Sequence, residues 1–120
     1  MRRQEKLRAA VQERLGEPVL AVGFVRVRSD GHDLPATAAL VVTEAKLRIW
    51  RVTGRLHRAL LDEVEVWDRR SVWILFDRRA KATRLTVSVP GGTGLVIDVP
   101  RHLGADGLLH TLAGGSVVAA

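Results

Sequence analysis

The sequence contains no cysteine and no tyrosine, and aromatic residues of any kind are scarce. The absence of cysteine excludes a disulfide-stabilised fold and any metal site built on thiolates. Only two phenylalanines and three tryptophans occur among the 120 residues. The core must therefore be built from valine, leucine, isoleucine and alanine. Apolar residues make up 47% of the chain, which is sufficient for one packed domain.

Long hydrophobic runs are also absent. No uninterrupted apolar run is longer than Val72–Phe76, whereas a membrane-spanning helix needs ~20 such residues. Residues 1–3 are basic, but charged residues follow them and no apolar signal segment appears. These absences favour a cytoplasmic protein.

Basic residues outnumber acidic residues. Lysine and arginine number 19 against 13 aspartates and glutamates, the formal net charge is +6, and arginine outnumbers lysine by 16 to 3. The surplus is spread along the chain and is not gathered in a tail. Such a surplus favours weak, salt-sensitive attraction to polyanions. An arginine-rich proteome explains it more simply.

Residues 3–15 are predicted to form a helix. Leu7, Val11 and Leu15 fall on one side of it and give a narrow apolar stripe, while charged residues cover the other sides. Pro18 prevents the helix from continuing. The stripe should dock on the outside of a sheet or on a partner.

Residues 19–99 contain a succession of short apolar stretches that predict about seven β-strands. The predicted strands span residues 19–28, 38–43, 46–52, 56–61, 64–68, 72–77, 83–89 and 94–99. The stretches 64–68 and 72–77 form either one bent strand or two. The first strand is apolar on both faces, so one face should meet the core and the other the first helix.

The third predicted strand alternates between apolar and charged residues. Leu47 and Ile49 alternate with Lys46 and Arg48, a pattern typical of a sheet with one solvent-exposed face. We therefore expect Arg48 to lie on that exposed face.

A closing helix is predicted between residues 101 and 112. Leu108, Leu109 and Leu112 form its apolar side, which would cover the open end of a bent sheet. The small residues of segment 114–120 predict a flexible tail.

The stretch Leu40–Trp50 resembles the second and third strands of bacterial pleckstrin-homology-like domains, including the small turn between them. Leu60–Val64 and the strand-then-helix order of residues 95–112 are similar to later parts of that family. The resemblance covers residues 19–113. It implies a bent antiparallel sheet or barrel of about seven strands capped by a C-terminal helix, with an extra N-terminal helix.

The resemblance also implies a division of the chain and a role. Residues 1–16 would form the extra helix, residues 17–113 the pleckstrin-homology-like domain, and residues 114–120 the tail. Members of the family serve as non-enzymatic interaction modules, and some bind phosphoinositide headgroups through basic residues on the first two strands. Arg26 and Arg28 occupy the matching region here, but the predicted second strand carries no basic residue.

Three groups of basic residues are candidate anion sites. The first group is Arg26, Arg28 and His32, at the open end between the first two strands. The second and densest group is Arg78, Arg79, Lys81 and Arg84, on and beside a predicted loop. The third group is a stripe of Arg48, Arg51, Arg55 and Arg58 across the third and fourth strands. The simpler interpretation of each group is a solvated surface.

Trp50, Trp67 and Trp73 are candidate interface residues, because large aromatic side chains anchor interfaces when they lie outside the core. Trp67 and Trp73 alternate with valine and isoleucine rows, so both should point outward if those rows face the core. The competing interpretation is that the first helix covers them or that a bend turns them inward.

The remaining motifs do not indicate an enzymatic reaction. The glycine-rich segment 91–94 joins two strands, so it predicts a hairpin turn and not a phosphate-binding loop. His32, His57, His102 and His110 are scattered without metal-ligand spacing. No catalytic residue, metal or cofactor is predicted.

A protein partner or a second copy of the chain is therefore the leading expectation. Peripheral binding to an anionic membrane surface is the alternative. Nucleic acid is less favoured, and no small-molecule substrate is indicated, because the inward rows contain no converging polar residues.

Overall fold

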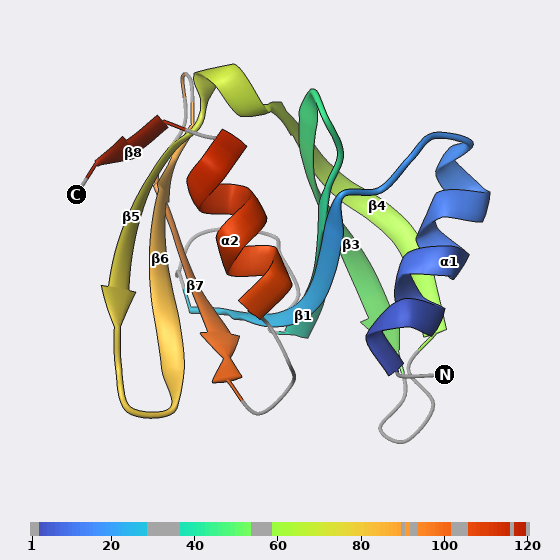
Figure 1. The fold of residues 1–120 in the computed structure, drawn as a ribbon, viewed down its shortest axis with the longest axis horizontal. Coiled ribbons are helices and arrows are strands. Elements are labelled where there is room, and N and C mark those ends of the chain that lie inside the picture. Colours follow the sequence, from blue (N-terminus) through green and yellow to red (C-terminus); the bar gives the residue numbers. More distant parts are fainter. Residues whose placement is uncertain are drawn as a thin grey trace.

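The computed structural model describes residues 3–28, 37–53, 59–89, 91, 94–101, 106–115 and 117–119. The elements are α1 (Arg3–Leu15), β1 (Ala21–Val27), β2 (Thr37–Val42), β3 (Lys46–Thr53), β4 (Ala59–Asp68), the 3₁₀ turn η1 (Arg69–Ser71), β5 (Trp73–Arg78), β6 (Ala82–Ser88), β7 (Leu95–Pro100), α2 (Asp106–Gly115) and β8 (Val117–Ala119). Figure 1 shows their arrangement.

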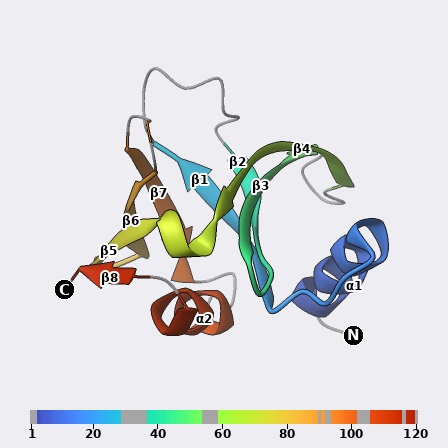
Figure 2. The same cartoon turned by 90° about the horizontal axis from the view of Figure 1, so that it is seen from above.

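Strands β1 to β7 form an antiparallel sheet in the spatial order β4-β3-β2-β1-β7-β6-β5. Strand β1 lies at the centre, because it pairs with β2 along most of its length and with β7 at its end. The sheet bends so strongly that its two halves face different directions (Figure 2). The predicted seven-stranded bent sheet with one helix at each end of the chain is confirmed.

One face of β1, β2 and β3 packs into the main core. Leu40, Leu47 and Ile49 point into this core together with the inward rows of β5, β6 and β7. Helix α2 closes it through Leu108 and Leu112, both almost fully buried. The predicted role of the closing helix is confirmed for these two leucines.

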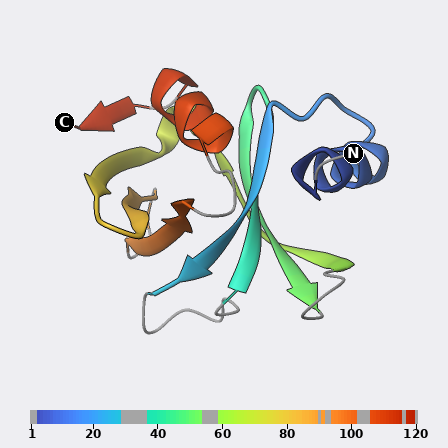
Figure 3. The same cartoon turned by 60° about the horizontal axis from the view of Figure 1, so that its bottom comes forward.

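The opposite face of β1, β2 and β3 packs on α1. Leu7 and Val11 of the helix contact a second cluster that includes Phe24, Val41 and Trp50. Figure 3 shows α1 and α2 on opposite sides of these strands. Both faces of β1 are therefore covered, and the apolar stripe of α1 docks on its own chain.

The prediction of a solvent-exposed face on β3 is wrong. The side chain of Arg48 is only 15% exposed, and Trp50 on the same face is 3% exposed. The residues of β3 do alternate between two faces, but α1 covers the face on which Arg48 and Trp50 lie.

Two further boundaries differ from those expected, and one alternative left open by the sequence is settled. The stretches 56–61 and 64–68 belong to one strand, β4, over the described residues. The stretches 64–68 and 72–77 belong to separate strands, β4 and β5, with η1 between them. The end of the expected flexible tail forms β8, which pairs in parallel with the outer edge of β5. Pairing there satisfies backbone groups that an edge strand otherwise exposes.

A buried arginine joins η1 to two other parts of the fold. Arg69 is 5% exposed and donates through Nη1 to the carbonyl oxygens of Thr43 (3.0 Å) and Glu44 (3.3 Å), and through Nη2 to that of Thr111 in α2 (3.1 Å). Its backbone N–H donates to Ala45. Burial lowers the pKa of Arg69 from its usual value. The guanidinium thus fixes α2 against the β2–β3 turn.

Arg69→Ala should lower the free energy of unfolding by about 2–4 kcal/mol, because one buried and two partly buried carbonyl oxygens lose a charged donor. Urea denaturation measures the loss. Arg70→Ala is the matched control, since Arg70 is adjacent and exposed, and it should change stability by no more than ~0.5 kcal/mol. Equal effects of the two substitutions would contradict this role of Arg69.

Candidate functional site

One face of β5, β6 and β7 has no helix over it in the described part of the chain. The other face of these strands packs into the main core through Ile74, Leu85 and Ile97. We call the uncovered side the open face. It consists of the outward-pointing residues Trp73, Leu75, Asp77, Arg84, Thr86, Val96 and Asp98, with Arg26 and Arg28 from the end of β1.

Cross-strand pairing places charges of alternating sign in a row across the open face. Asp77 lies opposite Arg84, Arg84 opposite Asp98, and Asp98 opposite Arg26. Directly opposite residues point to the same side of a sheet, so these side chains are neighbours. The row results from register, since its members come from four strands.

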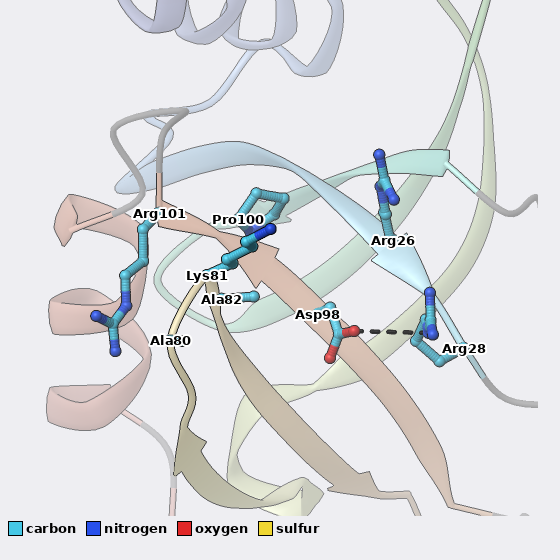
Figure 4. Close-up of a pocket in the computed structure, with 8 residues that line it drawn as sticks. All are labelled: Arg26, Arg28, Ala80, Lys81, Ala82, Asp98, Pro100 and Arg101. Atoms are coloured by element: carbon cyan, nitrogen blue, oxygen red, sulfur yellow. Dashed lines mark ion pairs between the residues drawn. The ribbon is translucent and has the colours of Figure 1, made fainter.

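Asp98 is the centre of this row. Arg84 donates to both of its carboxylate oxygens, with Nε–Oδ1 at 2.8 Å and Nη2–Oδ2 at 3.2 Å. Arg28 approaches the same carboxylate at 3.5 Å (Figure 4). The hydrogen bond from Arg84 is the main reason that the pKa of Asp98 lies below its usual value, and the same bond raises the pKa of Arg84. Asp98 is therefore held ionised between two cations.

A pocket of about 730 Å³ opens beside this pair. Its lining residues are Arg26, Arg28, Ala80, Lys81, Ala82, Asp98, Pro100 and Arg101. We call it the basic pocket. Its walls come from the end of β1, the turn between β5 and β6, and the end of β7 (Figure 4).

The ladder between β6 and β7 positions two of its cations. The ladder extends to the pair Ala82 and Pro100, and beyond it the Arg101 N–H donates to the Lys81 carbonyl at 3.1 Å. Lys81 and Arg101 are therefore adjacent. In Figure 4 the Arg101 guanidinium points away from Arg26, so the cations bracket the pocket and do not meet at one point.

The basic pocket has an excess of positive charge. Its one carboxylate, Asp98, already has Arg84 and Arg28 as partners. Arg26, Lys81 and Arg101 form no ion pair with any residue that the structure describes. An anion entering the pocket would meet three cations whose charge no described carboxylate offsets.

In the structure, the residues predicted to contact anions are grouped differently from the sequence prediction. Arg26, Arg28 and Lys81, predicted as parts of separate groups, meet in the basic pocket. Arg79, which directly follows β5, instead forms an ion pair with Asp77 of β5, with Nη2–Oδ2 at 3.0 Å.

The other two residues of the densest predicted group also separate. Arg84 is a residue of β6 and is bound to Asp98. Arg78 ends β5 and lines a different pocket of about 530 Å³, with Arg101 and Leu109 among its other residues.

The basic pocket lies in a different place from the anion site expected between the first two strands. The basic pocket lies on the β7 side of β1, and β2 contributes no lining residue. His32, expected beside Arg26 and Arg28, is outside the described residues.

The expected arginine stripe on β3 and β4 is neutralised where the structure describes it. Arg48 donates to Glu63 at 2.7 Å, and Arg51 lies 3.7 Å from Asp62. Arg55 and Arg58 are outside the described residues.

Only one of the three tryptophans is available on the surface. Trp50 is buried under α1, where its indole N–H donates to Glu63 at 3.3 Å and the Arg14 guanidinium lies 4.7 Å from the ring centre. Trp73 is 54% exposed, and its neighbour Leu75 on the open face is 45% exposed.

The condition for an outward-pointing Trp67, a valine row that faces the core, is not met. It is half-buried and packs against the main core, whereas Val66 is exposed. The β3–β4 register explains the reversal, because Trp67 lies opposite the buried Leu47 and Val66 opposite Arg48.

Asp98 and Arg101 belong to the site and were not predicted. A signal for both was present in the sequence: extending the hairpin around residues 91–93 in register pairs Arg84 with Asp98 and brings Lys81 beside Arg101. The contribution of β1 had no such local signal, since β1 and β7 are far apart in the chain.

Comparison with protein-family models and with curated proteins finds no match for this chain. Within the described residues, no cluster of three potential metal ligands occurs. In the same part of the chain, no helix has the length and apolar character needed to cross a membrane. The site must therefore be interpreted from its own chemistry.

Asp98→Asn should destabilise the protein at pH 7 and should have much less effect near pH 2. The lowered pKa means that the ionised carboxylate stabilises the fold above its unfolded-state pKa of about 3.9, and that this contribution is lost as the pH falls through the folded-state value. Urea midpoints at several pH values measure the effect.

Asp77→Asn is the matched control, because Asp77 is on the same face but its ion pair is exposed. It should show a small effect at all pH values. An Asp98→Asn effect that is independent of pH would contradict the electrostatic explanation.

Proposed function

We propose that the protein is a non-enzymatic interaction module that binds an anionic group of a partner in the basic pocket. The observation that carries this proposal is the presence of three cations, Arg26, Lys81 and Arg101, around one pocket without an ion pair among the described residues. Each of these cations lacks an ion-pair partner among the described residues, and a bound carboxylate or phosphate would supply one.

The chemistry of the pocket supports binding more than catalysis. Arginine and lysine side chains are protonated at neutral pH and act as donors. The remaining ionisable group, Asp98, is engaged by Arg84, and its lowered pKa makes it a weak general base. A group of fixed donors is suited to recognising an anion.

We also propose that the domain is related to bacterial pleckstrin-homology-like domains. The bent seven-stranded antiparallel sheet and the C-terminal helix that closes its main core support this relationship. The proposed site differs from the one that the resemblance implied, because it uses β7 and the β5–β6 turn in place of the second strand. A cytoplasmic location is part of the same proposal.

The test is a titration of the full chain with inorganic tripolyphosphate at ~50 mM salt, followed by amide chemical shifts. The largest shifts should fall on residues 26–28, 80–82 and 98–101. The double variant Arg26→Ala/Lys81→Ala should weaken binding on the order of tenfold, because charge-assisted contacts are lost. Binding should also weaken as salt is raised.

The control is Lys6→Ala/Arg8→Ala, which removes the same charge from exposed positions on α1. It should change the affinity by no more than about twofold, as expected from net charge alone. Equal losses in the two double variants, or shifts spread over all basic surfaces, would contradict a specific pocket.

A further inference from the structure

We infer that the basic pocket is one end of a longer docking surface, and that its partner is an extended acidic polypeptide segment carrying an apolar side chain. This inference rests on the proposed function, since the acidic part of the segment would occupy the basic pocket. The apolar part would contact Trp73 and Leu75, which we call the tryptophan patch.

The pocket and the tryptophan patch lie on the same open face. Along β5, Trp73, Leu75 and Asp77 point outward, and alternate residues of a strand point to the same side. Asp77 belongs to the charged row that ends at Arg26. Asp77 lies about 13 Å along β5 from Trp73, and Arg26 lies three inter-strand steps of about 4.8 Å from Asp77 across the sheet, so about 20 Å separates Trp73 from Arg26. An extended segment of about six residues would cover that distance.

The tryptophan patch has the properties of an anchor site. The exposed fractions of Trp73 and Leu75 are 54% and 45%, and the two side chains are neighbours on one strand face. Thr86 on β6 lies opposite Leu75, and the half-buried Val96 on β7 lies opposite Thr86, so the patch continues into a mixed polar and apolar surface. Such surfaces bind aromatic or aliphatic side chains of a partner.

Docking would use the face of the sheet and not its edge. Strand β8 pairs with β5 at Trp73, Ile74 and Leu75, so the backbone groups on that edge already have a partner strand. The side chains of Trp73 and Leu75 remain exposed on the open face. Recognition therefore depends on side chains, and alanine substitution at these positions tests it directly.

Charge favours an acidic segment over a second copy of the chain. The formal net charge is +6, and the basic pocket adds cations without partners among the described residues. Two copies joined through this face would bring those cations together. An acidic segment instead supplies the carboxylates that the pocket is able to bind.

The distribution of charge also favours a polypeptide over a membrane. Two carboxylates lie on the open face: Asp77 between the tryptophan patch and the pocket, and Asp98 in the pocket wall. A membrane would bring anionic headgroups against both carboxylates at once, because its surface is uniform. A polypeptide can place its acidic groups at one end and its apolar group at the other.

The experiment measures fluorescence anisotropy of two labelled polymers of similar length with the full chain: poly-L-glutamate, and a random copolymer of glutamate and tyrosine in a ratio of about 4:1. The copolymer should bind at least about fivefold more tightly, because tyrosine buries an aromatic ring on the patch. Trp73→Ala and Leu75→Ala should each remove most of this preference and leave the affinity for poly-L-glutamate unchanged.

Leu20→Ala is the matched control for Leu75→Ala. Leu20 is also a leucine, it is 43% exposed, and it precedes β1 outside the open face. It should leave both affinities unchanged. The variant Arg26→Ala/Lys81→Ala should weaken binding of both polymers.

Different failures distinguish the inference from the proposed function. Equal binding of both polymers in the wild type, with poly-L-glutamate still dependent on Arg26 and Lys81, would overturn only the inference. Absence of binding to both polymers, together with no tripolyphosphate shifts at the pocket, would overturn both. A dimer in sedimentation equilibrium that Trp73→Ala abolishes would overturn the inference in favour of a second copy. Trp73-dependent binding to phosphatidylserine vesicles without polymer binding would overturn it in favour of a membrane.

Discussion

Strands β1, β2 and β3 carry apolar side chains on both faces, and the need to cover both faces determines the rest of the arrangement. Helix α1 covers one face through Leu7 and Val11. Helix α2 and strands β5, β6 and β7 cover the other. Both helices in the described part of the chain therefore pack on the β1–β3 region or on the core beneath it. The outer side of β5, β6 and β7 is left open as a result.

The electrostatics of the open face follow from strand register. Asp98 stands between Arg84 and the end of β1, so its charge is offset within the sheet. Two other cations of the pocket, Arg26 and Lys81, have no ion pair among the described residues. Asp98 thus orders the pocket wall through its ion pairs with Arg84 and Arg28. Because it is already paired, the net charge of the pocket stays positive. Loss of the Arg84–Asp98 pair would alter both the sheet and the site.

Sequence reasoning succeeded where a side chain's environment depends on its own strand. The alternation of apolar and polar residues in the predicted strands 83–89 and 94–99 matches the inward Leu85 and Ile97 and the outward Thr86, because strand side chains have a period of two. Alternation alone did not decide the face of Trp67, which is set by pairing with β3. Sequence reasoning also missed Arg69, which looks like a surface residue in a turn until three carbonyl oxygens from distant segments converge on it.

The sequence by itself determined the approximate positions of strands β1 to β7, the two helices, the leucines that close the core and the approximate location of the basic residues, because these depend on local periodicity and composition. Only the tertiary structure decided that Arg26, Lys81 and Arg101 share one pocket, and that Trp73 alone of the three tryptophans stays exposed. The physical reason is that local patterns specify which residues alternate, whereas the pairing of β1 with β7 and the docking of α1 specify which faces meet and which remain in solvent.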